Sequence, residues 1–297
     1  MSLRVTEQSR QTAHVRYITM AQAKLDRIQE TLSTSRRINR ASDDPAGTAL
    51  ALRHREDLSF EAQMRRNMDN GAAFMNVSEA AMNGATEALQ RIRELTVQAA
   101  NDTLNPADRL TIAKEIDELT RHIAQVANTN FGGAYVFSGH QTGTAAYNVV
   151  GDPPTAITYQ GDAGARTRRI SKSDVLAVNA TGQQVFGTTF NDLIQLRTDL
   201  AAGGPAPVIT AHLTEIDAAL ERLIAARADI GSRLNRFEAA MAQSEQTGLN
   251  LEGLRSKIEE PDLAETIMQM QQQSQALEAA LGAIGRTANM SLLNFLR

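Results

Sequence analysis

Apolar residues recur at steps of three and four along much of this chain. Near the N-terminus the step begins at Ile18 and continues through Ala21, Leu25, Ile28 and Leu32. This spacing places the five side chains on one face of a helix, at the a and d positions of a heptad repeat. The pattern therefore predicts an amphipathic helix of roughly 30 residues at this end of the chain.

The C-terminal end carries the same repeat. Glu260-Pro261-Asp262 precedes it, and an acidic residue just ahead of an apolar run is typical of a helix start. The positions that share the face are Leu263, Ile267, Met270, Ser274, Leu277, Leu281, Ile284, Ala288, Ser291 and Phe295. We expect the two terminal helices to pair in antiparallel fashion, because this arrangement covers both apolar faces.

Three further helical faces lie between the ends. The first, from Val77 to Ala99, predicts a helix that ends near Asn101. The second follows Asn105-Pro106-Ala107-Asp108, in which Asn caps the helix and Pro occupies its first turn. Its apolar positions are Ile112, Ile116, Leu119, Ile123 and Val126. The third face runs from Leu213 to Met241 and is interrupted by Arg227.

Residues 131–190 differ from the helices on either side. Glycine and threonine become frequent, and short strand-forming runs alternate with turn signals such as Asp152-Pro153-Pro154. The expected strands are Ala134–Ser138, Ala156–Gln160, Arg166–Ile170 and Val175–Val178. Asn191 is expected to cap a short helix that ends at Gly203-Gly204. We interpret the segment as a small β domain inserted between helices.

The predicted elements are nested. The terminal helices form the outermost pair, the middle helices the next pair, and the β insert the tip. The expected fold class is mainly α with an inserted small β domain, in which both ends of the chain build a bundle of long antiparallel helices. The expected domains are an inner coiled coil (residues 1–45 and 256–297), a middle helical bundle (46–131 and 190–255) and an outer β-rich insert (132–189).

The terminal apolar faces are narrow for a folded monomer. Burial of one Leu or Ile contributes about 1.5–3 kcal/mol, whereas ordering the backbone of one residue costs about 1–2 kcal/mol. We therefore expect the termini to be largely disordered in the free protein and helical on assembly with neighbours. The candidate assembly-interface residues are Ile18, Leu25, Ile28, Leu32, Ile267, Met270, Leu277, Leu281, Ile284 and Phe295.

The stretch INRASDDPAGTALALR, residues 38–53, separates the first helix from the next. Asp43 and Asp44 could form a catalytic or metal-binding pair, but no histidine, serine nucleophile or glycine-rich phosphate loop accompanies them. A structural role fits better: Ser42 and both acids cap the following helix, and Pro45 lies in its first turn. The candidate joint residues are Arg36, Arg37, Arg40, Ser42, Asp43, Asp44, Pro45 and Gly47.

Composition narrows the classes of function. With no cysteine among 297 residues, disulfides, thiolate zinc sites and cysteine nucleophiles are excluded, and a net charge of −4 gives no argument for nucleic acid. The histidines show no metal-ligand spacing, and the phosphate-binding and dinucleotide-binding glycine motifs do not occur. We expect no catalytic residue, no metal, no cofactor and no enzyme activity. Charged residues interrupt the N-terminal segment, and no apolar run reaches the roughly 20 residues of a membrane span. We therefore expect neither a cleaved signal peptide nor membrane insertion.

Several longer motifs resemble the bacterial flagellin superfamily. RRINRASDDPAGTALALR (36–53) is similar to its N-terminal signature, as are LQRIRELTVQAANDTLNPADR (89–109) and EIDELTRHIAQVANTNFGG (115–133). LGAIGRTANMSLLNFLR (281–297) resembles its amphipathic C-terminal helix. The resemblance covers about residues 1–135 and 210–297. It implies a flagellin-like fold and a structural component of the bacterial flagellum.

Two branches of the superfamily compete. GGAYVFSGHQT (132–142), ITYQGDAGARTRRIS (157–171) and TGQQVFGTTFNDLIQLRTDL (181–200) resemble the hook–filament junction branch, that of hook-associated protein 3. LQRIRELTVQAAN is closer to flagellin itself, so a bulk filament subunit stays an alternative. An enzyme hidden in the β insert is a third interpretation.

The resemblance also implies a location and partners. It implies export in unfolded form through the flagellar type III apparatus, and an extracellular position at the hook–filament junction. The implied partners are a hook-associated protein on the hook side, flagellin on the filament side, further copies of this chain in a helical lattice, and an export chaperone. The terminal helices would lie in the inner core of the tube, and the β insert outside. In this arrangement, Arg36, Arg37 and Arg40 are expected to pair with acids on neighbouring subunits.

Overall fold

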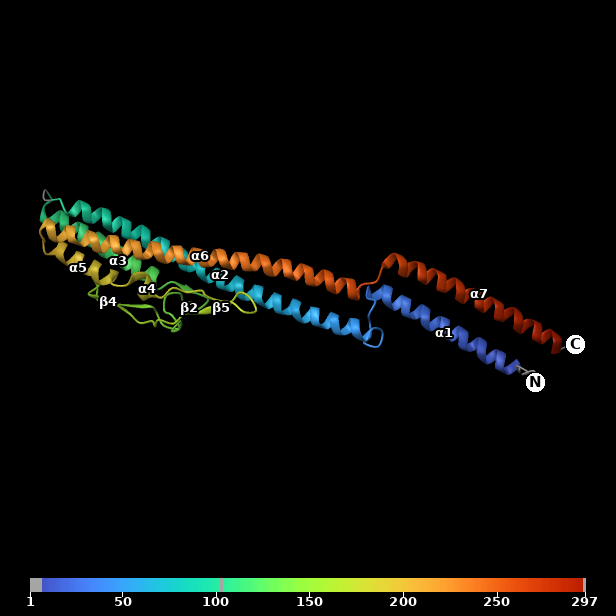
Figure 1. Ribbon diagram of the computed structural model, residues 1–297. Coiled ribbons are helices and arrows are strands. Elements are labelled where there is room, and N and C mark those ends of the chain that lie inside the picture. The colour runs from blue at the N-terminus through green and yellow to red at the C-terminus, as the bar shows by residue number, and fades with distance from the viewer. Residues whose placement is uncertain (1–6, 102–103, 296–297) are drawn as a thin grey trace. The chain divides into compact units, whose positions relative to one another are not determined.

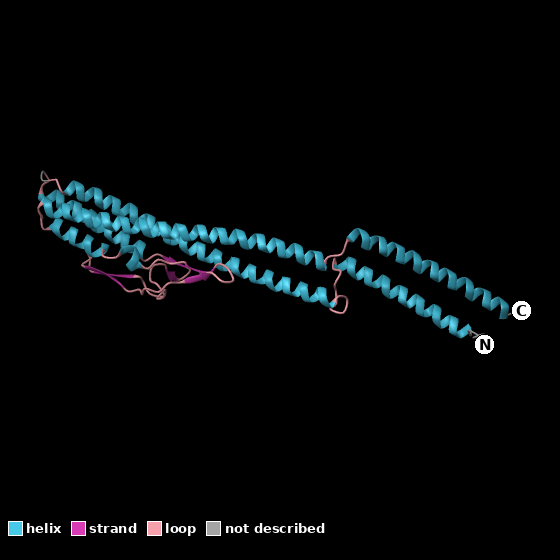
Figure 2. Ribbon diagram, in the orientation of Figure 1, coloured by secondary structure: helices cyan, strands magenta, loops and turns pink. Residues whose placement is uncertain are grey.

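Two nested units make up the chain. A computed structural model describes residues 7–101 and 104–295, without the side chains of residues 7, 8, 10, 11 and 287–295. The first unit joins the segment up to Phe60 to the segment from Thr247 onward, and the second unit is Glu61–Gln246. Helices dominate both units, and all the described strands belong to the second (Figures 1 and 2). The mainly α fold with a small β insert is thereby confirmed, whereas the finer division into three domains stays a prediction.

Antiparallel terminal helices form most of the first unit. Helix α1 (Glu7–Thr34) lies alongside α7 (Leu263–Phe295) (Figure 1). The pairing predicted from the two heptad faces is thus confirmed. Helix α1 ends where Ser35 takes a φ of 53°, a left-handed conformation that stops the helix. The unit also holds the first turns of α2 (Pro45–Ala99) and the last turns of α6 (Ala206–Glu259).

The cap predicted for the start of α3 is present. Helix α3 (Pro106–Ala127) begins after Asn105, whose side chain accepts a hydrogen bond from the backbone N–H of Asp108 at 2.9 Å. Its apolar face is buried at Ile112, Ile116 and Ile123. These contacts explain why the segment folds as a helix: a capped start is followed by one continuous face that packs on its neighbours.

In the second unit, Gly71 of α2 packs closely against the ring of Phe237 of α6. A Cβ atom at this position would lie 2.7 Å from Cε1 of Phe237, so only glycine fits without a shift. The interruption of the predicted apolar face at Arg227 is explained by an ion pair, because its Nη2 lies 2.7 Å from Oε1 of Glu79 on α2. The two long helices are therefore held by both apolar and charged contacts.

The β insert consists of three separate antiparallel pairs of strands in the described part of the chain. The pairs are β1 (Asn130–Phe131) with β2 (Ala134–Tyr135), β3 (Tyr147–Val150) with β4 (Ala156–Tyr159), and β5 (Thr167–Arg169) with β6 (Val175–Ala177). The sequence pattern indicated four of these strands but missed β1 and β3. Strand β3 has only four residues, three of them exposed, so it lacks the alternation that identifies a half-buried strand.

Side-chain contacts fasten two of the three hairpins to helices: two contacts hold the β3–β4 hairpin and one holds the β5–β6 hairpin. The side chain of Asn128 at the end of α3 donates to the carbonyl of Tyr147 at 2.8 Å. Nη2 of Arg197 on α5 (Thr189–Ala201) donates to the carbonyl of Pro154 in the β3–β4 turn at 2.8 Å. Nη1 of Arg233 on α6 donates to the carbonyl of Asn179, just after β6, at 3.0 Å.

An aromatic cluster joins the insert to two short helices. The ring of Tyr147 lies 5.7 Å from that of Phe186 in α4 (Gly182–Phe186) and 4.7 Å from that of Phe190 in α5. The sequence pattern did not predict α4, which has a complete capping box at Thr181. The expected cap at Asn191 is wrong, because α5 begins at Thr189 and Phe190 already packs within the helix.

Candidate assembly interface and joint

The predicted interface residues divide into covered and open positions. Ile18, Leu25, Ile28 and Leu32 of α1 are half-buried, as are Met270, Leu277 and Ile284 of α7. Ile267 and Leu281 are 44% and 47% exposed. The side chain of Phe295 lies outside the described residues. The hairpin of α1 and α7 therefore covers one row of the α7 heptad and leaves large side chains of the other row open.

Further apolar side chains of the first unit are exposed. Tyr17 on α1 is 69% exposed, and Met268 on α7 is 63% exposed. Val15, Met20 and Leu263 are exposed as well. The heptad analysis missed most of these residues, because they lie off the repeat; large apolar side chains on an otherwise polar face were the signal available. By contrast, Ala51 is the single fully buried apolar residue among the described side chains of this unit.

The two acids of the joint accept hydrogen bonds from nearby backbone N–H groups, Asp44 as the cap of α2 and Asp43 within the preceding turn. Oδ1 of Asp44 accepts from the backbone N–H of Gly47 at 2.8 Å, which caps α2 at its N-terminus. Oδ2 of Asp43 accepts from the backbone N–H of Arg40 at 2.8 Å and closes the preceding turn. The hydrogen bond from Gly47 and the neighbouring Arg37 guanidinium hold the pKa of Asp44 below its usual range. Asp44 alone occupies the cap position, and Ser42 is exposed.

The arginines of the joint differ in their surroundings. Nη2 of Arg37 lies 3.2 Å from Oδ2 of Asp44, and Nη2 of Arg40 lies 3.6 Å from Oε2 of Glu30, so both contact acids of the same chain. Arg36 is exposed. The expectation that these arginines pair with neighbouring subunits stays a prediction, and two of them already have partners within the chain.

Pro45 and Gly47 shape the start of α2. Pro45 is its first residue, where a missing N–H costs nothing. A Cβ atom at Gly47 would lie 2.8 Å from Cδ1 of Ile38 and would collide with the Asp44 carboxylate. The joint thus needs glycine here because the connector packs tightly against the first helical turn.

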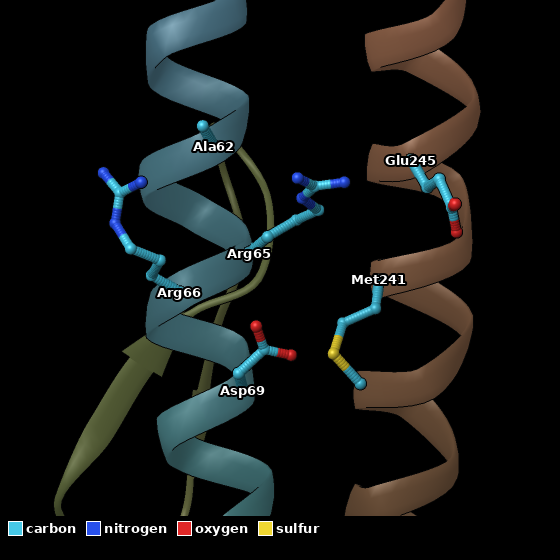
Figure 3. Close-up of a pocket in the computed structure, with 6 residues that line it drawn as sticks. All are labelled: Ala62, Arg65, Arg66, Asp69, Met241 and Glu245. Carbon is cyan, nitrogen blue, oxygen red and sulfur yellow. The ribbon is translucent and has the colours of Figure 1, made fainter.

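A groove of about 360 Å³ lies between α2 and α6 in the second unit. Figure 3 shows Arg65 and Asp69 of α2 pointing toward α6, where Met241 and Glu245 form the opposite wall, while Arg66 points away. Mixed surface charges without a nucleophile or a general base in hydrogen-bonded geometry do not form a reaction centre. Among the described residues, no cluster of histidine and acidic side chains is suited to a metal ion, and no helix is both long and apolar enough to cross a membrane.

Paired terminal helices, a helical bundle and a β insert together define a mainly helical structural subunit. Models of the bacterial flagellin N-terminal helical region and of the bacterial flagellin C-terminal helical region match residues 5–142 and 213–296. Between them they span most of the chain. This chain therefore belongs to the bacterial flagellin family, and it is a structural protein of the flagellum.

Two relatives and one solved structure show the range of this similarity. Flagellin of Bacillus subtilis (strain 168) is 31% identical over 85% of this chain and 86% of that protein. Flagellar hook-associated protein 3 of Escherichia coli (strain K12) is 24% identical over 98% of each. The crystal structure of flagellar hook-associated protein-3 from Legionella pneumophila has a TM-score of 0.62 at 18% identity, and covers 69% of this chain and 98% of that one. This last likeness shows the fold alone.

Proposed function

We propose that this protein forms the adaptor zone between a hook-associated protein on the hook side and the flagellin filament. The observation that carries an assembly role is the open row of α7, where Ile267 and Leu281 remain exposed after α1 has packed on the other row. A charged or polar residue would suit a helix face that stays in water. Large apolar residues on that face favour a permanent partner.

The free energy of burying apolar side chains also favours binding partners for the first unit. Burial of one exposed Leu or Ile contributes about 1.5–3 kcal/mol, and the free hairpin leaves several such side chains uncovered. Neighbouring subunits that cover Ile267, Met268 and Leu281 would add this contribution to two long helices that have almost no core of their own. In this proposal, copies of the chain and the proteins above and below it provide that cover.

The insert favours the junction over the bulk filament. The alignment with hook-associated protein 3 of E. coli extends over 98% of each chain and so includes the β insert. The motif GGAYVFSGHQT, residues 132–142, forms the start of that insert here. The higher identity to B. subtilis flagellin favours a second candidate, a filament subunit, and this alternative remains part of the proposal.

The proposed mechanism is mechanical. The subunit leaves the cell unfolded with an export chaperone's help and without a cleaved signal peptide, and its termini fold against subunits already in place. Lateral contacts then repeat around a helical lattice, which is a heterologous packing that extends instead of closing. The upper surface suits flagellin, and the lower surface suits the hook side.

The deciding experiment counts copies of this chain per hook in purified flagella by quantitative mass spectrometry. An adaptor is present in a fixed number that does not change when filaments are sheared to different lengths. Deletion of the gene should then leave hooks intact while flagellin escapes into the medium. A copy number that rises with filament length would reject the adaptor and identify a filament subunit.

A further inference from the structure

Arg37 lies in the connector between α1 and α2, yet it is bound to the distant end of α6. Its backbone N–H donates to the carbonyl of Glu259 at 2.6 Å. Its Nη2 and Nε donate to the carbonyl of Ile258 at 2.8 and 3.2 Å. Nη2 also donates to Oδ2 of Asp44 at 3.2 Å. One residue therefore contacts the last turn of α6 and the cap of α2 at the same time.

The carbonyls that Arg37 binds are the ones that the end of α6 leaves open. In a continuous helix, the carbonyls of residues 258 and 259 would accept from the N–H groups of residues 262 and 263. Pro261 has no N–H and disfavours a continuous helix, so α6 ends at Glu259. Carbonyls at a helix end need donors from elsewhere, and Arg37 supplies them.

The start of α7 is stabilised separately. Oδ1 of Asp262 accepts from the backbone N–H groups of Ala264 and Glu265 at 2.9 and 3.1 Å. Asp262 thus caps α7, while Arg37 satisfies the end of α6. The break between α6 and α7 is therefore stabilised on both sides, by Arg37 at the end of α6 and by Asp262 at the start of α7.

A second contact ties the same turn of α6 to α2. The Glu259 carboxylate is only 8% exposed, and its Oε1 lies 2.6 Å from Nη2 of Arg55 on α2. Nε of Arg255 lies 3.9 Å from its other oxygen. The end of α6, the first turns of α2 and the connector at Arg37 therefore form one network within the first unit.

We infer that Arg37 is a latch that couples the two places where the chain passes between long helices, the connector at residues 35–44 and the α6–α7 break at residues 260–262. While Arg37 binds the last carbonyls of α6, the break between α6 and α7 persists even when Pro261 is replaced. With the latch removed, Pro261 alone prevents α6 and α7 from joining into one helix. The inference does not depend on the proposed adaptor role.

The test is a double-mutant cycle in the full-length protein, with Pro261→Ala and Arg37→Ala, read by amide hydrogen exchange at residues 262 and 263. Pro261→Ala alone should leave exchange at these amides fast, because Arg37 still holds the carbonyls of 258 and 259. Pro261→Ala with Arg37→Ala should slow exchange at residue 262 about tenfold or more, because its amide takes over the carbonyl of 258 that the guanidinium no longer holds. The backbone N–H of residue 37 still donates to the carbonyl of 259, so residue 263 should stay fast and serves as an internal reference. Each residue's effect thus depends on the other.

Arg36→Ala is the matched control, since it removes the same charge from the neighbouring, exposed position. Pro261→Ala with Arg36→Ala should behave as Pro261→Ala alone. The latch is rejected if Pro261→Ala alone slows exchange at residue 262 as much as the double variant, or if the double variant stays as fast as wild type there. It is also rejected if, in the wild type, the amide of residue 37 exchanges as fast as an unprotected one.

Discussion

The same two helices, α2 and α6, pass through both units of this protein and meet different surroundings in each. In the second unit, α3, α5 and the insert surround them, and the large side chains of Met68, Met75 and Phe237 are fully buried. In the first unit, the described side chains of the helices bury little more than Ala51 completely. Burial here follows the number of neighbours and not the hydrophobicity of the helix. The second unit holds a core of its own, whereas the first keeps its apolar surface for other subunits in the proposed assembly.

The largest expected effect is on assembly. Leu281→Asp places a carboxylate in the open row of α7, where its burial without a partner would be costly. We expect filament attachment to be lost while urea unfolding of the purified monomer stays unchanged. Gln275→Asp adds the same charge at an exposed polar position of α7 and should attach normally. Normal filaments in cells that carry Leu281→Asp would remove the argument for this surface. Leu277→Asp should also block attachment, but its side chain is half-buried in the hairpin, so Leu281 gives the cleaner test.

The next prediction compares how much a core substitution in each unit lowers the free energy of unfolding. Phe237→Ala should lower the free energy of unfolding by about 3–5 kcal/mol, because it removes a fully buried ring and leaves a cavity beside Gly71. Leu25→Ala, at a half-buried position of α1, should change it by about 1 kcal/mol or less in the free protein. Urea titrations followed by far-UV circular dichroism measure both. Equal losses would mean that the first unit has a core of comparable strength.

The smallest effect is a dependence on pH that belongs to the second unit. His212 is buried, with Nε2 at 2.9 Å from Oδ2 of Asp199 on α5 and Nδ1 at 2.7 Å from Oε2 of Glu215 on α6. Burial lowers its pKa, but hydrogen bonds to the two carboxylates outweigh this, so the pKa lies above its ordinary value of 6.5. The stabilisation is complete below that value and is lost as pH rises through the raised pKa.

The urea midpoint should therefore fall as the pH rises above about 6.5, the ordinary pKa of histidine. His212→Gln should flatten this part of the curve, whereas His122→Gln, at an exposed position, should keep it. A wild-type midpoint that is constant over this range would contradict the charged state of the buried ring.

Local patterns in the sequence predicted the long helices well. Heptad spacing identified α1 and α7, and Asn105 with Pro106 marked the start of α3, because these signals depend on neighbours within one or two turns. The short strand β3 and the five-residue helix α4 were missed, since neither is long enough to show a period. The residue type of Asn191 alone predicted a cap, but Asn191 lies inside α5, which begins at Thr189.

The exposed face of α7 and the contacts of the joint were harder to predict, because they depend on residues far apart in the sequence. A heptad shows which residues share a helix face, but not which row a neighbouring helix covers, so Ile267 and Met270 looked equivalent. The contact of Arg37 with Ile258 joins residues 221 positions apart, and no local pattern encodes it. In the sequence, Arg37 is only a charged residue in a connector between helices, and its distant partner becomes visible only in the folded structure.

The construction of the insert has a practical consequence. In the described residues its hairpins are separate two-stranded ribbons; Asn128 and Arg197 hold the β3–β4 hairpin, and Arg233 holds the β5–β6 hairpin. A peptide spliced into the turn at residues 171–174 would extend the β5–β6 ribbon and leave both links of the β3–β4 hairpin in place. The protein therefore offers a site for displaying foreign epitopes, with its helices as an unaltered carrier.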